Sequence, residues 1–206
     1  MAAVEQLSEL VREACGDAIA DARIAIGELT VEVEPGAVTT VLATLRDHPE
    51  LAFEQLIDLA GVDYSTYGTE SRAPPAVVEP GDGEVLRLAV AYHVLSLTHN
   101  HRIRVRARLD PERPGVDSVV GLWPVANWYE REAFDLYGIV FHGHPDLRRL
   151  LTDYGFIGHP FRKAFPISGH VEMRYDEEKR RVVYEPVSIE PRVLVPRVSR
   201  REGYRA

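Results

Sequence analysis

Hydrophobic and polar residues repeat with periods that predict the first elements of the chain. Apolar residues at positions 4, 7, 10, 11 and 14 follow helical spacing, which predicts an amphipathic helix over Val4 to Ala14. Residues 28–34 alternate strictly between Glu or Thr and an apolar residue, the pattern of a strand buried on one face. Pro35-Gly36 ends this strand, and residues 38–46 are predicted to form a second helix.

A second alternating stretch predicts a β-hairpin over residues 85–109, with its turn near His99 and Asn100. Its second strand has arginine at every other position, and these share one face: Arg102, Arg104, Arg106 and Arg108. This arginine stripe is either an anion or partner site, or a solvated sheet face paired with the acidic residues of strand 28–34. We favour the solvated face, because opposite charges on neighbouring strands commonly stabilise a sheet.

The rest of the chain carries weaker patterns. Residues 53–67 are predicted to begin as a helix and continue as a strand, and residues 119–123 to form a short helix or strand. Gly, Pro and charge dominate residues 68–84, which predicts a mobile loop. Six prolines follow Gly138 and prevent long elements, although a hairpin is predicted over residues 171–184 around a turn at 176–179. The C-terminal third is therefore expected to be extended and ordered by a neighbour.

Length and composition limit the kinds of protein this chain can be. Its 206 residues fit one domain, or one domain with a long extension, and an apolar content of 45% can supply a core. The single cysteine, Cys15, cannot form an internal disulfide or hold an iron–sulfur cluster, which usually takes four thiolates. The acidic start indicates neither a signal peptide nor a transit peptide, and the apolar run 85–97 is too short to span a bilayer. We expect a reducing compartment on the cytosolic side.

Charge is distributed unevenly along the chain. Residues 1–100 hold 17 acidic and 5 basic residues, whereas residues 101–206 hold 15 acidic and 19 basic residues. The acidic half would repel phosphate, so this polarity favours a protein docking surface over a nucleic-acid site. A nucleic-acid binder that uses the arginine stripe is accordingly the weakest alternative.

Residues 127–151 concentrate ionisable side chains. A helix is predicted over residues 127–137, with Asn127 as its N-cap, Glu130 closing a capping box and Gly138 at its C-terminal end. Arg131 and Asp135 are four residues apart and are predicted to pair. Glu130 and Glu132 point about 160° apart around such a helix, so they are not expected to form a catalytic carboxylate pair.

The sequence His142-Gly-His144-Pro-Asp146 matches the start of a two-metal hydrolase ligand set. The histidine that should follow directly is Leu147, and the glycine and proline suit a surface turn. Other histidines could complete a metal site only through folding (His93, His159, His170). A metal-dependent hydrolase stays open as a distant alternative, while the usual hydrolase and nucleotide-binding motifs are absent from the sequence.

The stretch "EREAFDLYGIVFHGHPDLRRLLTDYGFIGHPFRKAFP" resembles the signature of the 30-kDa subunit of respiratory complex I, which in bacteria is the C subunit of proton-translocating NADH–quinone oxidoreductase. The matching positions are Glu130-Arg131-Glu132, Asp135, His144, Arg148, Gly158-His159-Pro160, Arg162-Lys163 and Pro166. The resemblance extends to "LIDLAGVDY", the 85–109 hairpin, "NWYERE" and "VVYEPV", and "TDYGF" and "RYDEEKRRVVYEPV" resemble the alphaproteobacterial and mitochondrial branch.

This resemblance implies a place in a large assembly. The family is a cofactor-free part of the hydrophilic arm, so no catalytic, cofactor-binding or metal residue is expected here, and FMN and iron–sulfur clusters belong to partner subunits. The implied partners are chiefly the 49-kDa subunit (the D subunit in bacteria), with subunits B and I nearby. The implied location is the cytoplasmic face of the bacterial inner membrane or the mitochondrial matrix side, with membrane contact only through the complex. That complex transfers electrons from NADH to ubiquinone and couples the transfer to proton translocation.

Pattern and resemblance together predict an α+β fold. Residues 1–140 are expected to form a compact domain with a mostly antiparallel sheet and flanking helices, and residues 141–206 an extended segment that packs on a partner and ends in an arginine-rich tail. The equivalent scaffold subunit of a membrane-bound hydrogenase or another quinone reductase remains an alternative.

Our hypothesis for the charged stretch is an assembly site. Arg131 with Asp135 is expected to hold the local helix, and the residues expected to reach the neighbour are His144, Asp146, Arg148, Arg149, Arg162 and Lys163. The full set of interface positions is Glu130, Arg131, Glu132, Asp135, His144, Asp146, Arg148, Arg149, His159, Arg162 and Lys163.

Overall fold

The computed structural model describes residues 2–65, 88–110 and 112–189. The chain divides into two compact units, residues 1–165 and residues 166–206, and each is described by itself. The predicted mobile loop 68–84 and the arginine-rich tail lie entirely outside the described residues. The predicted boundary after residue 140 stays a prediction, while residues 141–165 group with the first unit by their contacts.

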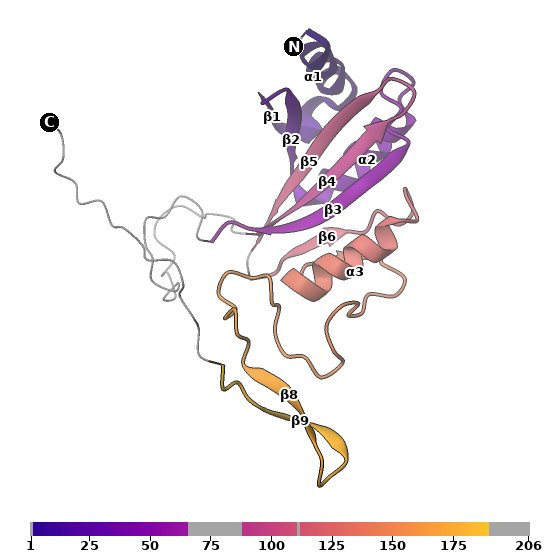
Figure 1. Ribbon diagram of the computed structural model, residues 1–206. Coiled ribbons are helices and arrows are strands. Elements are labelled where there is room, and N and C mark those ends of the chain that lie inside the picture. The colour runs from indigo at the N-terminus through magenta and orange to yellow at the C-terminus, as the bar shows by residue number, and fades with distance from the viewer. Residues whose placement is uncertain (1, 66–87, 111, 190–206) are drawn as a thin grey trace, which may run out of the picture. The chain divides into compact units, whose positions relative to one another are not determined.

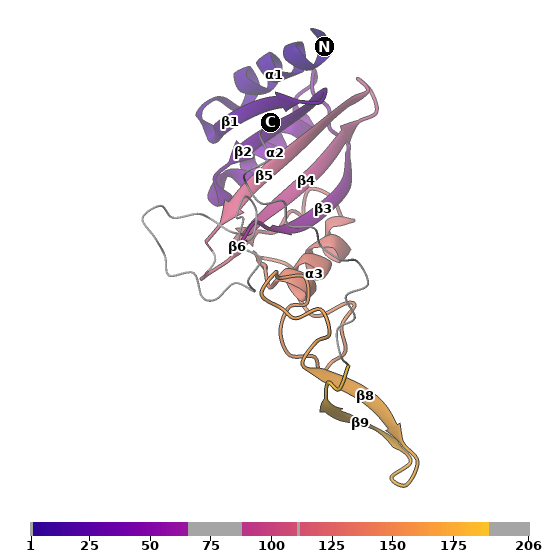
Figure 2. The ribbon, with the colours of Figure 1, turned by 60° about the vertical axis from the view of Figure 1, so that its left-hand side comes forward.

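The first unit is built on a five-stranded sheet with the order β1-β2-β5-β4-β3 (Figures 1 and 2). Its strands are β1 (Ile19–Ala25), β2 (Glu28–Val33), β3 (Gln55–Asp63), β4 (Leu88–Ser96) and β5 (His101–Leu109). Only the β2–β5 pairing is parallel, so the sheet is mixed but mostly antiparallel. A short parallel pair lies apart from it, β6 (Gly115–Asp117) with β7 (Val140–His142).

Helices complete the first unit and confirm the α+β class. The α-helices of the described residues are α1 (Ala2–Cys15), α2 (Val38–Asp47) and α3 (Ala126–Tyr137), and the 3-10 turns are η1 (Gly16–Ala18) and η2 (Pro35–Ala37). Helices α1 and α2 cover one face of the sheet, and α3 lies along the edge strand β3 (Figure 1). The Tyr129 hydroxyl donates to the Ile57 carbonyl at 2.9 Å, so α3 also satisfies an edge group of that strand.

One hydrophobic core explains why the periodic elements form. The alternation of β2 places Leu29, Val31 and Val33 in the core, where they meet the helical stripes of α1 and α2. Each such side chain contributes about 1.5–3 kcal/mol when fully buried. The predicted helices, the strand 28–34 and the described part of the 85–109 hairpin are therefore confirmed.

Three predictions about local structure are wrong or incomplete. No helix precedes β3, because Phe53 is buried in an irregular segment and the strand pairs with β4 along its whole length. Residues 119–123 form turns, in which the buried Trp123 indole donates to the Glu54 carbonyl at 3.0 Å. Strands β1, β6 and β7 were not predicted, since β1 is largely exposed and the other two have three residues each.

The arginine stripe is the solvated, paired face that we favoured. Strands β2 and β5 run parallel in register, and Arg104 Nη2 lies 2.9 Å from Glu28 Oε2. Glu32 pairs with both Arg106 and Arg108, the second at 3.1 Å. Partial burial alone would raise the pKa of Glu32, but the bonds from Arg108 and Arg106 lower it overall. The Arg104–Glu28 pair, whose side chains are 36% and 67% exposed, contributes about 0–1 kcal/mol.

The second unit contains the predicted C-terminal hairpin, with β8 (Val171–Asp176) antiparallel to β9 (Arg181–Pro186). Its turn is held by Asp176, whose Oδ1 accepts from the Glu178 and Lys179 amides at 3.1 and 3.0 Å. An Asx-type turn of this kind explains why a tight hairpin forms in a proline-rich part of the chain.

Candidate functional site

Helix α3 carries the start of the charged stretch, but it is not capped as predicted. It begins at Ala126 with no side-chain cap, so the capping box of Asn127 and Glu130 is wrong. Glu130 is fully buried and accepts from the Ser118 hydroxyl at 2.6 Å and the Val119 amide at 2.7 Å. Burial raises the pKa of Glu130, and these two bonds oppose that rise. Its carboxyl group therefore ties the preceding turn to α3.

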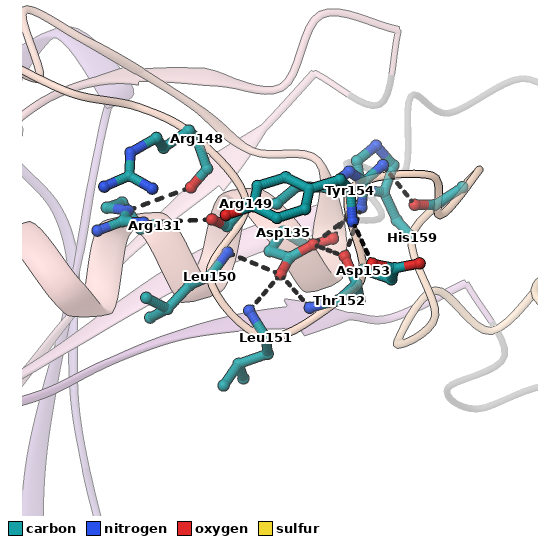
Figure 3. A network of polar contacts seen from close by, with 11 residues as sticks. Arg131, Asp135, Arg148, Arg149, Leu150, Leu151, Thr152, Asp153, Tyr154 and His159 are labelled. Atoms are coloured by element: carbon teal, nitrogen blue, oxygen red, sulfur yellow. Dashed lines mark hydrogen bonds and ion pairs between the residues drawn. The ribbon is translucent and has the colours of Figure 1, made fainter. Parts of the chain in front are cut away.

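Asp135 is the centre of the site (Figure 3). One carboxylate oxygen accepts from the backbone amides of Leu150, Leu151 and Thr152 at 3.0, 2.7 and 2.8 Å. The other accepts from the Thr152 hydroxyl and from Arg149 Nη1, the latter at 2.8 Å. Burial alone would raise the pKa of Asp135, but the bonds from Thr152, Leu151 and Leu150 hold it far below its ordinary value. One buried carboxylate thus fixes the path of residues 149–152.

The predicted pair between Arg131 and Asp135 is wrong. Arg131 instead donates through Nε to the Arg148 carbonyl and through Nη2 to the Arg149 carbonyl, both at 3.2 Å. The Arg131 guanidinium also lies 6.0 Å from the centre of the Trp128 ring. Helical spacing allowed the pair, but the backbone of residues 148–152 satisfies both side chains instead.

The C-terminal end of α3 is covered by two residues of the predicted set. The ring of His159 bonds through Nδ1 to the Asp135 carbonyl at 3.0 Å, and Arg162 Nε donates to the Tyr137 carbonyl at 2.7 Å. A cation at this position also complements the negative end of the helix dipole. Gly138 ends α3 in the left-handed conformation as predicted, and a Cβ there would lie 2.5 Å from the His159 ring.

Arg149 links the centre of the site to its far end. Besides pairing with Asp135, its guanidinium donates to the Gly158 carbonyl at 3.1 Å and lies 5.8 Å from the centre of the Phe156 ring. Residues 149–162 are therefore bound to α3 at several points, although they form no regular element.

The histidines of the H-x-H-x-D stretch do not converge on a metal position. The His144 ring bonds through Nε2 to the Asn127 carbonyl at 3.1 Å and accepts the Asp146 amide through Nδ1 at 3.0 Å. With both ring nitrogens engaged, His144 has no lone pair left for a metal. Among the residues that the structure describes, no group of three or more His, Cys, Asp or Glu side chains is placed to hold a metal ion.

The remaining predicted positions face solvent. Arg148 and Asp146 pair at 2.8 Å, and more than half of each side chain is exposed. Glu132 is exposed, as is Lys163, whose backbone amide donates to Asp63 Oδ2 at 2.7 Å. These four residues are the charged members of the set that remain accessible to a neighbour.

A group of exposed apolar side chains surrounds the site, and the sequence did not reveal it. We call it the outer apolar group: Trp128, Leu151, Tyr154, Ile157 and Phe161, which are 55–95% exposed. In Figure 3 the Leu151 side chain points away from Asp135, while its amide points toward it. The sequence did contain one signal, because these apolar residues mostly lie in a segment with neither helical nor strand periodicity. Such residues have no regular face that could pack into the core, so they are expected to be exposed. The site therefore has a polar interior, and its exposed side carries these apolar side chains beside the four charged ones.

Comparison with known proteins places residues 31–171 in a family described as "Respiratory-chain NADH dehydrogenase, 30 Kd subunit". The C subunit of NADH-quinone oxidoreductase from Thiobacillus denitrificans is 57% identical over 202 residues, covering 98% of this chain and 96% of the relative. The same subunit of Halorhodospira halophila is 53% identical over 229 residues, covering 98% and 93%.

Solved structures are similar as well. A trypsin-resistant fragment (1–134) of Nqo5 is 30% identical with a TM-score of 0.53, covering 69% of this chain and 99% of the fragment. A chain of the membrane-bound sulfane sulfur reductase, an archaeal respiratory membrane complex, gives a TM-score of 0.58 at 19% identity, covering 80% and 86%, and shares the fold alone. No helix in the described part of this chain is both long and apolar enough to cross a membrane.

Proposed function

This chain belongs to the family of the 30-kDa subunit of respiratory-chain NADH dehydrogenase and is a subunit of NADH–quinone oxidoreductase, and we propose that it acts there as a scaffold without cofactors of its own. The electrons pass from NADH through FMN and iron–sulfur clusters of partner subunits to quinone. In this proposal the chain contributes surfaces that position those partners in the hydrophilic arm.

The use of the charged residues carries this proposal. Four of them form hydrogen bonds within the chain, chiefly to backbone atoms: Glu130, Arg131, Asp135 and Arg149. Side chains that are already saturated in this way are poorly placed to transfer protons or hold substrate, but they fix a loop without regular structure. What they fix is the outer apolar group, which is the kind of surface that a partner buries.

The interface that we propose therefore differs in composition from the one predicted from sequence. The outer apolar group forms its centre, and the exposed charges Glu132, Asp146, Arg148 and Lys163 form its rim. An apolar centre with a polar rim is the usual anatomy of a protein interface. The rim charges fix orientation more than they add affinity, because exposed charges are screened.

The second unit supplies a separate surface. Facing pairs along β8 and β9 are Val171 with Pro186, Met173 with Tyr184 and Tyr175 with Val182, so all six side chains lie on one face. Five of them are large hydrophobics that are 54–61% exposed: Val171, Met173, Tyr175, Val182 and Tyr184. A two-stranded hairpin is marginally stable alone in water. We propose that a partner protein covers this face when the C-terminal segment packs on it.

The partner that we propose for both surfaces is the 49-kDa subunit, with subunits B and I close by. The scaffold of a hydrogenase or another quinone reductase is the second candidate, and co-purifying subunits distinguish the two. Relatives more than 50% identical over nearly the whole chain carry the name NADH-quinone oxidoreductase, which favours the first candidate.

The test uses the chain tagged in its native membranes, with gentle detergent solubilisation and affinity purification. The double variant Tyr154→Ser with Ile157→Ser should recover about tenfold less flavin, iron–sulfur absorption and NADH–quinone activity per tagged chain, because exposed aromatic and aliphatic anchors dominate binding energy. Ile167→Ser is the matched control, since Ile167 is also fully exposed but lies outside both proposed surfaces. Full recovery by the double variant would contradict the proposed interface.

A further inference from the structure

Two hairpin turns lie at the same end of the five-stranded sheet, and both expose apolar residues. Because β2 and β5 are parallel, with Leu29 opposite Ile103, the β1–β2 turn and the β4–β5 turn lie at the same end (Figure 2). Ile26 in the first turn is fully exposed, and Leu97 in the second is 66% exposed. We call these two residues, with Arg102 at the start of β5, the turn-tip surface.

The β1–β2 turn uses an unfavourable residue at its most exposed position. Ile26 has a φ of 54° and Gly27 a φ of 77°, so both central residues are left-handed, as in a type I′ turn. Asn-Gly is the preferred pair for this turn, whereas a β-branched residue is strained in the left-handed region. Ile26 therefore breaks a local rule and also exposes a large apolar side chain. A strained residue of this kind points to a function rather than to folding.

The β4–β5 turn is fixed by hydrogen bonds to residues that precede β3. Glu54 accepts from the Leu97 amide at 2.7 Å and from the Thr98 hydroxyl, and the His99 ring bonds the Pro49 carbonyl at 3.0 Å. Leu97 is thus presented on a fixed backbone, which lowers the entropy lost when a partner binds it.

The charge and shape of the turn-tip surface indicate the chemistry of a partner that would bind it. Arg102 is exposed, and it alone in the arginine stripe has no ion pair to an acid within the described residues. A recess of about 490 Å³ opens beside it, and its lining mixes apolar and polar residues, among them Ile57, Asp58 and His101. The complementary surface has apolar side chains for the two tips, Ile26 and Leu97, and a carboxylate for Arg102.

We propose that the turn-tip surface is a second docking site of this chain, for another protein of the same complex that presents apolar side chains beside a carboxylate. This rests on the proposed scaffold function. The turn-tip surface lies where β2 and β5 begin, and the strands end at Val33 and Leu109 at the other end of the sheet. None of its residues belongs to the charged stretch.

Ile26→Asn tests the proposal, because asparagine suits the left-handed turn position that isoleucine strains. The thermal midpoint of the purified full chain should stay equal or rise. Recovery of NADH–quinone oxidoreductase per tagged chain should nevertheless fall about tenfold in Ile26→Asn and in Leu97→Asn, and by less in Arg102→Gln, whose charge sits at the rim. Ala20→Asn is the control, since Ala20 is exposed on β1 away from the turn.

Each outcome decides one claim. Lower recovery with an unchanged or higher thermal midpoint supports the second docking site. Normal recovery by all three tip variants would overturn it, as would a lowered thermal midpoint in Ile26→Asn or a homodimer of the wild-type chain that Ile26→Asn dissolves. If the wild-type chain itself recovered no complex, the scaffold function would fail instead.

Discussion

Two regions of this chain are rich in charge, and the structure uses them in opposite ways. On the sheet, Arg104, Arg106 and Arg108 pair with Glu28 and Glu32 at the surface. Around α3, Asp135 and Arg131 are buried, and most of their bonds go to the backbone of a distant segment. Charge density alone therefore does not identify a site. The identity of the bonded partner does, because a side chain that holds backbone determines the shape of the chain.

The largest effect should come from Asp135→Asn. An asparagine oxygen cannot replace a carboxylate that accepts five bonds, and Arg149 loses its ion-pair partner. Breaking such a buried network should lower the free energy of unfolding by about 3 kcal/mol or more. Urea unfolding of the full chain measures this change. Asp146→Asn is the control, because it removes the same charge from an exposed pair and should leave the free energy of unfolding unchanged. Equal losses of free energy in the two variants would contradict the contrast between buried and surface charge.

A smaller, pH-dependent effect should separate the two buried carboxylates of α3. Burial places the pKa of Glu130 above its ordinary value of 4.5, so the folded chain holds more protons there than the unfolded chain. Stability from this group falls as the pH rises from 4.5 through the folded pKa. For Asp135 the folded pKa is lowered, so its contribution is present above 3.8 and is lost as the pH falls below that value.

Glu130→Gln should therefore flatten the fall in stability above pH 4.5, whereas Asp135→Asn should remove part of the loss in acid. Urea midpoints at a series of pH values, compared with the wild-type chain, measure both slopes. A wild-type curve that rises with pH just above 4.5 because of Glu130 would contradict the buried environment described for it.

The smallest effect should come from the arginine stripe. Arg104→Gln breaks one pair with Glu28, whose side chain is 67% exposed, so the free energy of unfolding should fall by at most about 1 kcal/mol. The difference should shrink further when salt is added, since exposed pairs are screened. A fall in the free energy of unfolding as large as that of Asp135→Asn, and independent of salt, would contradict this. It would show that the stripe stabilises the fold as strongly as the buried network of α3.

The sequence predicted the elements that have a periodic pattern, but not the contacts between side chains and distant backbone. Elements with a period, such as β2 and α1, were predicted because burial of one face leaves a repeat in the sequence. The edge strand β1 was missed because most of its residues are exposed and leave no such repeat. The charged stretch was identified by its concentration of ionisable residues and by a family resemblance, but the bonding partners of its side chains were not predicted. Asp135 binds the amides of Leu150, Leu151 and Thr152, and backbone amides have no sequence signal.

The central claim is that Asp135 holds residues 149–152 in place within the chain, before any partner is bound. Hydrogen exchange of the Leu150, Leu151 and Thr152 amides in the purified full chain tests it most directly, with Asp135→Asn as the comparison. The structure predicts that these amides are protected in the wild-type chain alone and exchange freely in Asp135→Asn, because the carboxylate accepts all three. Free exchange in the wild-type chain, with protection only inside the assembled complex, would contradict the claim and show that the partner builds this site.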